Sequence, residues 1–265
     1  MLGAKALQNF LERTDKMNPI AGNIKMYVQA LSDIVPSKIS EIKNIYDPTV
    51  KATGPYLEPN TGITYMGQVK NGIAEGWGKV VTKQGDYYEG FFISGVLDVY
   101  CRQLSRTGKY YEGGLKHGHR HGKGFLVDSA RIRIECTWEQ GTPMGLTKIF
   151  DRNNLLLFEG ESCNGLLSGD NCYYRDKVRG FEYRGGFSKG KFNGKGTKWY
   201  DNKDVYEGPF ENGHENGQGK LSFADGTVYS GTFKDGRPHG NGSVIKVNGK
   251  DESVTFENGQ MIRTE

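Results

Sequence analysis

Three alternating histidines, His117, His119 and His121, come closest in type and spacing to a metal site. Alternate residues of a strand share one face, and imidazoles gathered there could bind zinc or copper. His121-Gly122 has a counterpart in His239-Gly240, because both dipeptides occupy the same place in a repeated pattern. Membership of the repeat is enough to explain this histidine, so we expect neither a metal nor a cofactor.

Glycine-rich and nucleophilic residues make no better case for catalysis. Gly-Lys-Gly occurs at Gly122–Gly124 and at Gly194–Gly196. A phosphate-binding loop needs the longer Gly-x-x-x-x-Gly-Lys-Ser/Thr sequence with a helix after it, and the sequence contains none. The serines and histidines fall in predicted loops and suggest no Ser/His/Asp arrangement. The sequence therefore predicts a protein that is not an enzyme.

Basic residues gather in two clusters that could contact anionic lipid headgroups. The clusters consist of Arg175, Lys177 and Arg179, and of Lys189, Lys191, Lys195 and Lys198. We favour a different interpretation, in which these residues form a solvated face and discourage unwanted strand pairing. The whole chain has 35 basic and 31 acidic residues, a formal charge of +4, which argues against a dedicated nucleic-acid binder.

An internal repeat of about 23 residues sets the positions of all these residues. Its pattern is Tyr-x-Gly-x-aromatic-x-x-Gly-x-x-x-Gly-x-Gly. Eight copies begin at Tyr65, Tyr88, Tyr111, Ile134, Phe158, Tyr183, Tyr206 and Tyr229, and a half copy follows with Phe256 and Gly259. The intervals are 23 residues except for 24 before Phe158 and 25 before Tyr183. The second, fourth and fifth copies depart from the pattern but keep its register.

Each copy predicts one β-hairpin. The tyrosine, the first glycine and the aromatic residue alternate, so they share one face of a strand. The next glycine follows a polar residue in Asn71-Gly72, Asn212-Gly213 and Asp235-Gly236, which favours a tight turn. The chain returns through Gly-x-Gly, whose bare surface lets an aromatic ring from a neighbouring strand lie across it. A second turn, as at Asp225-Gly226, leads to the next copy.

Because one hairpin is marginal in water, the hairpins must stack. We therefore predict a mainly β fold, an elongated single-layer antiparallel ribbon of tandem hairpins over residues 61–265. Its open ends allow a homodimer. One face of such a ribbon stays open, and aromatic-lined grooves suit peptides or helices. We expect a partner protein to bind part of an aromatic strip formed by Tyr65, Tyr88, Phe92, Tyr111, Trp138, Phe187, Tyr206, Phe210, Tyr229 and Phe233.

Residues 1–60 predict a short α-helical segment. Apolar residues recur at helical spacing from Leu7 to Thr14, and more strongly from Ile20 to Val35. A third helix begins near Pro36, and the part around Gly54, Pro55 and Pro59 is predicted to be a connector. The segment either caps the open edge of the first repeat or docks onto another chain. The docking residues would be Ile24, Tyr27, Val28 and Leu31.

Cysteine spacing and hydropathy indicate the compartment. Cys101, Cys136, Cys163 and Cys172 form no Cys-x-x-Cys pair, so they are expected to be reduced thiols in a reducing compartment. The first 16 residues lack the apolar core of a signal peptide, and no run of 18 apolar residues exists. The sequence therefore predicts a cytoplasmic protein that is not secreted and has no transmembrane segment.

The stretch Tyr206-Glu207-Gly208-Pro209-Phe210-Glu211-Asn212-Gly213, followed by Gly217-Gln218-Gly219, resembles the MORN repeat, the membrane occupation and recognition nexus motif. Tyr229–Gly242, Tyr183–Gly196 and Tyr65–Gly78 resemble it about as closely. The resemblance covers residues 61–265 and implies an all-β ribbon of hairpins.

Members of that family occur in ciliary radial spokes and other axonemal parts, in junctional proteins linking membranes, in phosphatidylinositol phosphate kinases and in a lysine methyltransferase. The enzymes carry a separate catalytic domain, for which the 60 residues before the repeats are too short. The resemblance therefore implies a repeat-only scaffold that docks into a larger assembly, either ciliary and axonemal or otherwise cytoskeletal. The alternatives are a peripheral membrane adaptor that binds acidic phospholipids and an accessory regulatory subunit of an enzyme complex.

Overall fold

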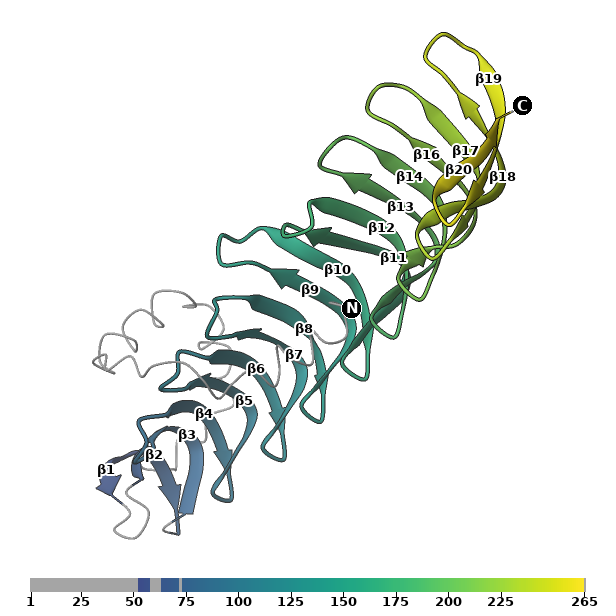
Figure 1. Cartoon of the computed structure of the whole chain (residues 1–265). Helices are drawn as coiled ribbons and strands as arrows, with labels where there is room; N and C mark the ends of the chain where they lie inside the picture. Colours follow the sequence, from purple (N-terminus) through teal and green to yellow (C-terminus); the bar gives the residue numbers. More distant parts are fainter. Residues whose placement is uncertain (1–51, 58–62, 72, 265) are drawn as a thin grey trace. The chain divides into compact units, whose positions relative to one another are not determined.

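The computed structural model describes residues 52–57, 63–71 and 73–264. These residues fall into two compact units, which we call the N-terminal unit, up to residue 142, and the C-terminal unit, from residue 143 onward. The described chain is almost entirely β-strand and turn (Figure 1).

The strands of the N-terminal unit are β1 (Ala52–Leu57), β2 (Thr64–Lys70), β3 (Ile73–Val81), β4 (Tyr87–Ile93), β5 (Val96–Leu104), β6 (Tyr110–Lys116), β7 (His119–Val127) and β8 (Arg133–Glu139). The strands of the C-terminal unit are β9 (Thr142–Phe150), β10 (Leu156–Cys163), β11 (Leu166–Asp176), β12 (Phe181–Ser188), β13 (Lys191–Tyr200), β14 (Val205–Glu211), β15 (His214–Glu215), β16 (Gly217–Ser222), β17 (Val228–Lys234), β18 (Arg237–Ile245), β19 (Asp251–Glu257) and β20 (Gln260–Thr264). Within each unit, successive strands pair antiparallel in chain order, except that β15 and β16 both pair with β14. The prediction of tandem antiparallel hairpins is confirmed.

The turn inside each hairpin has the geometry that the sequence predicts. Asn212 and Gly213 have φ angles of 52° and 95°, and the pair Glu211 and His214 closes the two-residue loop. Left-handed backbone at both turn positions defines the type I′ turn, whose twist matches that of the strands. Ser94 and Lys189 take the place of the asparagine in other copies and still adopt φ of 49°. The repeat therefore imposes this turn even where the local residue does not favour it.

Three additional residues explain the longer intervals. Leu156 pairs with Phe150 and Phe158 with Ile149, so Leu157 is an additional residue in the ladder, a β-bulge that lengthens the interval to 24 residues. In the next copy, Phe158 pairs with Tyr174, one residue further along than in the first copy, where Tyr65 pairs with Val80. The following turn, residues 177–180, adds the second residue of the 25-residue interval.

The first strand differs from the prediction. Residues 52–57 were expected to belong to a connector, but β1 pairs antiparallel with β2. The pairing shifts between Thr53 and Tyr56, so Gly54 and Pro55 lie in an irregular part of the ladder where proline, which lacks an N–H, is tolerated. The helices predicted before residue 52, with the docking residues Ile24, Tyr27, Val28 and Leu31, lie outside the described residues.

Tyrosine, glycine and bulge form one structural device in each well-conserved copy. A Cβ added to Gly78 would lie 2.5 Å from the Tyr65 hydroxyl oxygen and 2.6 Å from its ring, so only glycine leaves room for the ring. The pairing slips between Gly67 and Val69, and the Tyr65 hydroxyl donates a 2.6 Å hydrogen bond to the Gln68 carbonyl in this irregular stretch. The prediction that an aromatic ring covers the glycines is confirmed, and the hydroxyl explains why the first residue is tyrosine.

Candidate interaction groove

We number each copy from its tyrosine, which is position 1, and we call the sheet face that bears this side chain the aromatic face. Rings at positions 1 and 5 form a ladder along this face. Tyr65 meets Phe92 of the next copy edge-on with ring centroids 5.4 Å apart, and Tyr206 meets Phe233 at 4.8 Å. Edge-to-face contacts between rings contribute beyond simple burial.

This ladder accounts for most of the predicted binding strip. Nine of its ten residues are buried, and the exception is Tyr88, which is half-buried. Buried rings that contact one another leave little surface for a partner. Binding of a partner to the strip stays a prediction. Because most of the strip is buried, we expect a partner to reach it only where the ring ladder is incomplete.

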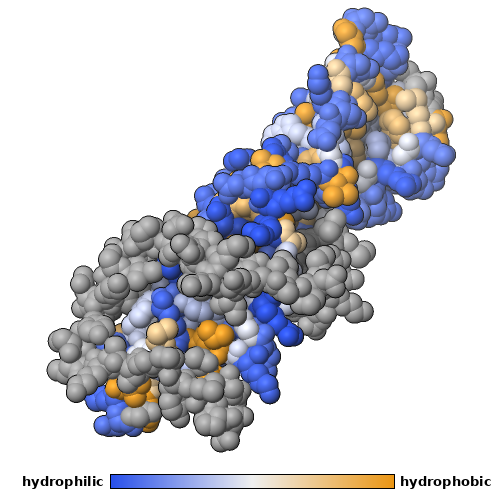
Figure 2. Space-filling view, turned by 90° about the vertical axis from the view of Figure 1, so that its left-hand side faces the viewer, coloured by the Kyte–Doolittle hydropathy of each residue, from blue (hydrophilic) through white to orange (hydrophobic). Residues whose placement is uncertain are grey.

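The ladder is incomplete in the N-terminal unit, where the aromatic face holds a groove of about 1110 Å³. Its apolar lining includes Ile63, Val69, Tyr88, Val96, Leu97 and Leu115. Hydrophobic residues are visible in orange at the lower end of Figure 2, at the height at which β2–β7 lie in Figure 1. A groove of this size and composition is suited to binding an apolar ligand.

Small side chains at positions 5 and 10 explain why a groove forms here. Val69 and Ala74 face each other across β2 and β3 of the first copy. In the sixth copy the same positions hold Phe187 and Phe192, whose ring centroids lie 5.0 Å apart, and Phe192 also stacks on Tyr183. The aromatic rings of the sixth copy therefore fill the space that valine and alanine leave open.

The degenerate second copy turns Tyr88 toward this groove. Position 14 of that copy is Cys101, where Gly78 and Gly124 leave room for a tyrosine ring. A Cβ added to Gly90 would meet Tyr100, Cys101 and Leu97, not Tyr88, so the Tyr88 ring does not cover this pair of strands. Because a cysteine side chain occupies that space, Tyr88 lines the groove as a half-buried ring.

Arg120 is the one arginine or lysine among the described residues that line the groove. It occupies position 10 of the third copy and pairs with Leu115 across β6 and β7. Its guanidinium carbon lies 4.8 Å from the centroid of the Tyr111 ring and 5.3 Å from that of the Trp138 ring. Burial lowers the pKa of Arg120 below its ordinary value, which still leaves the group charged at neutral pH.

Val99 shows that the degenerate copy also carries backbone strain beside the groove. It occupies a position that holds Gly76 in the first copy and Gly122 in the third, and it keeps their left-handed backbone with φ of 65°. A β-branched residue is a genuine outlier in this region. Strain of this kind tends to be retained near functional sites.

Replacing Val99 by glycine is expected to stabilise the N-terminal unit by about 0.5 to 1 kcal/mol, because relief of left-handed strain outweighs the entropy that glycine loses. Val96→Gly, at an equally exposed position of β5 with an ordinary backbone, is expected to destabilise it. Urea unfolding of the full chain measures both changes. A Val99→Gly variant that loses stability as Val96→Gly does would show that the strain is negligible.

The opposite face of the N-terminal unit, the polar face, carries a row of alternating charge. Lys79, Glu89, Arg102 and Glu112 lie directly opposite one another on β3 to β6. Opposite charges on neighbouring strands stabilise the pairing and fix its register. The sequence repeat alone did not reveal this row, because its members come from positions 2 and 15, which the repeat pattern leaves unspecified.

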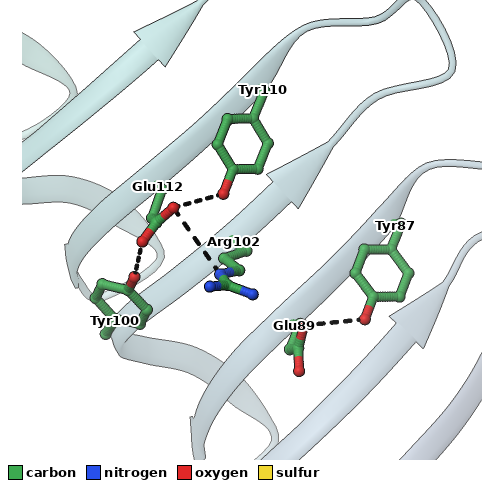
Figure 3. Close-up of polar contacts among 6 residues, drawn as sticks. All are labelled: Tyr87, Glu89, Tyr100, Arg102, Tyr110 and Glu112. Carbon is green, nitrogen blue, oxygen red and sulfur yellow. Dashed lines mark hydrogen bonds and ion pairs between the residues drawn. The ribbon is translucent and has the colours of Figure 1, made fainter. Parts of the chain in front are cut away.

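Glu112 is the centre of this row (Figure 3). Tyr110 donates a 2.6 Å hydrogen bond to one carboxylate oxygen, Tyr100 donates a short hydrogen bond to the other, and Arg102 Nε lies 3.9 Å away. Burial, with the bond to Glu112, raises the pKa of Tyr100 and Tyr110, so both phenols stay protonated donors. Glu89 repeats the arrangement more simply, accepting a 3.1 Å bond from Tyr87.

The variant Glu112→Gln is expected to lower the free energy of unfolding of the N-terminal unit by about 1 to 3 kcal/mol, because the buried tyrosines and Arg102 lose a charged acceptor. Glu135→Gln is the matched control, since Glu135 holds the same position in the next copy but is 43% exposed and pairs with Arg133 on the surface. That change is expected to cost less than about 1 kcal/mol. Equal effects in urea unfolding would contradict the central role of Glu112.

The histidines and cysteines that could do chemistry do not form a common site in the described part of the chain. His117 belongs to a turn, with φ of 52°, whereas His119 and His121 belong to β7. Within the described ranges, no three His, Cys, Asp or Glu side chains are grouped so as to hold a metal ion. Burial raises the pKa of Cys101 and of Cys136 to about 12, so these thiols are poor nucleophiles at neutral pH.

The two basic clusters are partly neutralised. Lys177 lies 2.5 Å from Asp151, Lys198 lies 2.9 Å from Glu215, and Arg175 pairs with Glu182. Lys189, Lys191 and Lys195 of the β12–β13 hairpin are exposed. In the described part of the chain, no helix is long and apolar enough to cross a bilayer.

The model of the MORN repeat matches the chain at residues 111–129, 183–205, 206–228 and 229–250. These stretches correspond to the third, sixth, seventh and eighth copies. No curated protein matches the chain.

Two solved structures resemble the chain weakly. The TCP domain of SAS-4 (dCPAP) from Drosophila melanogaster, in complex with a proline-rich motif of Ana2, is 10% identical, with 80% of this chain and 94% of that chain covered and a TM-score of 0.30. The TCP10 domain of CPAP from Danio rerio, in complex with a peptide of STIL, is 12% identical, with coverage of 80% and 98% and the same TM-score. At this TM-score neither likeness carries an argument about fold or function.

The assignment to this family rests on the four matched copies. It also rests on the hairpin, turn and glycine geometry that these copies share with the other described copies. The chain is a MORN repeat protein.

Proposed function

We propose that this chain is a non-catalytic scaffold of the repeat-only type, which docks into a larger protein assembly through the groove of the N-terminal unit. The observation that carries the proposal is the groove itself, about 1110 Å³, formed where the aromatic ladder is broken. In the sixth copy, by contrast, the rings of Tyr183, Phe187 and Phe192 pack against one another. A ciliary, axonemal or other cytoskeletal assembly is the proposed setting, and family resemblance alone supports it.

Three features support a binding role for the groove. Its lining is mainly apolar, Tyr88 presents a half-buried ring, and Val99, which pairs with the groove residue Leu115, keeps a strained backbone. Aromatic side chains in apolar grooves are typical anchors for partner proteins. The sixth copy, whose aromatic rings are tightly packed, has none of these three features.

The variant Ala74→Phe tests the proposal, because it places in the groove a ring like that of Phe192 in the C-terminal unit. The tagged full chain would be isolated from its own cells, and the stoichiometry of co-purifying proteins would be measured. We expect near-stoichiometric partners with the natural chain and their loss with Ala74→Phe. Lys220→Ala, a change on the polar face of β16, is the control and should retain them.

A partner that stays bound to the Ala74→Phe variant would place the interaction elsewhere on the chain. Natural protein that stays monomeric and co-purifies with nothing would rule out the scaffold role. The acidic-phospholipid alternative is tested by sedimentation with anionic vesicles at two salt concentrations. The ion pairs of Arg175, Lys177 and Lys198 predict weak, salt-insensitive recovery.

A further inference from the structure

Arg120 has no acidic partner within the described chain. Its contacts there are the rings of Tyr111 and Trp138, and none of the ion pairs or side-chain hydrogen bonds of the described residues includes its guanidinium. The side chain is half-buried in an apolar groove. Charges removed from water are normally paired, because an uncompensated one is costly.

Position 10 of another copy shows how the chain itself treats a charge on this face. Glu215 occupies position 10 of the seventh copy and is buried. Lys198 Nζ lies 2.9 Å from its carboxylate, and the Tyr200 hydroxyl donates a 2.8 Å hydrogen bond to it. The same repeat position therefore carries a satisfied carboxylate in one copy and a guanidinium that faces only aromatic rings in another. In contrast to Glu215, Arg120 is therefore a charged group of the groove without an oppositely charged partner among the described residues.

We propose that the groove binds an apolar segment of a partner protein that places an aspartate or glutamate side chain against Arg120. The inference rests on the proposed function and specifies the chemistry of the partner. Guanidinium groups recognise carboxylates through strong, oriented hydrogen bonds, and the flanking rings hold the arginine in place. Apolar residues on either side of the acid would contact Tyr88, Leu97 and Leu115.

Size favours a peptide segment over a small molecule. Pockets for small ligands typically measure roughly 300 to 1,000 Å³. This groove, at about 1110 Å³, lies at the upper end of that range, and its lining residues come from all six strands from β2 to β7. A segment with several apolar side chains and one acid matches its length and its single cation better than a compact ligand does.

The competing occupant is the chain's own apolar stripe between Ile20 and Val35. Its one acidic residue is Asp33, two positions from Leu31. At helical spacing, residues two apart point in nearly opposite directions, so this carboxylate would face away from an apolar contact made by Leu31. The stripe matches the apolar lining but does not supply the charge that Arg120 requires.

The experiment selects 16-residue peptides from a random phage-displayed library on the full chain. We expect enriched sequences with an aspartate or glutamate between apolar residues. One such peptide and its Gln or Asn counterpart are then measured by fluorescence anisotropy against the natural chain, Arg120→Gln and the surface control Arg131→Gln. Loss of the peptide carboxylate should weaken binding about tenfold or more for the natural chain and for Arg131→Gln. For Arg120→Gln it should change binding by less than about twofold.

Other results separate the two proposals. One outcome is that the peptides lose binding to Tyr88→Ala, while removal of the peptide carboxylate has the same effect with and without Arg120. That outcome overturns this inference and leaves the proposed function standing. Peptides that are insensitive to Tyr88→Ala count against the groove itself. A photoactivatable residue at position 97 that cross-links to residues 20–35 despite added peptide makes the chain's own segment the occupant. Displacement of the peptide by oleate assigns the carboxylate to a fatty acid, and either result overturns the inference.

Discussion

Replacing Tyr183 by alanine is expected to destabilise the C-terminal unit by about 3 to 5 kcal/mol, the usual cost of removing a fully buried aromatic ring. Tyr183 has no exposed surface. Its ring stacks on Phe192 at 4.0 Å and meets Phe187 and Phe210 edge-on at 5.6 and 4.9 Å. The loss would appear as a shift of the urea midpoint and as faster amide hydrogen exchange in β12, β13 and β14, because a repeat array loses stability chiefly near the altered copy.

The variant Tyr183→Phe is the matched control, since it keeps the ring and removes only the hydroxyl. That hydroxyl donates a 2.9 Å hydrogen bond to the Gly186 carbonyl. Leaving this carbonyl without its partner should cost about 1 to 2 kcal/mol. The fifth copy, which begins with Phe158, shows that the framework tolerates a phenylalanine at this position. An alanine variant no less stable than the phenylalanine variant would mean that the ring ladder contributes little.

Replacing Gly196 by alanine is expected to cost about 2 to 3 kcal/mol through overpacking. Its backbone conformation is an ordinary one, so the cost does not come from φ. The added Cβ would lie 2.5 Å from the Tyr183 hydroxyl oxygen and 2.6 Å from its Cε2 atom. The ring cannot move aside easily, because the neighbouring phenylalanines enclose it.

The same substitution in a Tyr183→Ala background supplies the control. With the ring removed, Gly196→Ala should cost less than about 0.5 kcal/mol, so that the double variant is more stable than the two single effects would predict. Urea unfolding of the four proteins gives the coupling free energy. If the two effects simply add, the glycine is required for a reason other than its contact with the tyrosine ring.

The repeating framework could be predicted from sequence because it depends on local and periodic chemistry. Tyr65, Gly67 and Val69 alternate, Asn71 and Gly72 predict the turn after them, and the register of later copies follows from the interval. The interval also predicts the turn in copies that lack a favourable turn residue, such as the copy with Lys189. It did not locate the additional residue at Leu157, because an interval of 24 does not say where the ladder bulges.

The groove could not be predicted in the same way. Attention to aromatic residues selected the ten strip positions, but nine of them are buried in mutual contacts and serve the framework. The informative residues are Val99 and Cys101, which depart from the pattern, and Ala74 and Arg120, which occupy position 10, where the pattern specifies no residue. A comparison of position 10 between copies would have identified Arg120 and Glu215 as charges among otherwise apolar or proline residues. The buried environment of Glu112 depends on cross-strand neighbours, which the repeat pattern leaves unspecified.

Position 10 has a consequence for how such proteins diversify. Ala74, Leu97, Arg120, Phe192 and Glu215 all occupy it, yet their hairpins share one turn geometry and one register. A single codon can therefore exchange a void, an aliphatic group, a ring, an acid or a base on the aromatic face while the backbone stays the same. Duplicated hairpins could in this way acquire different ligands independently, without any insertion or rearrangement of the chain.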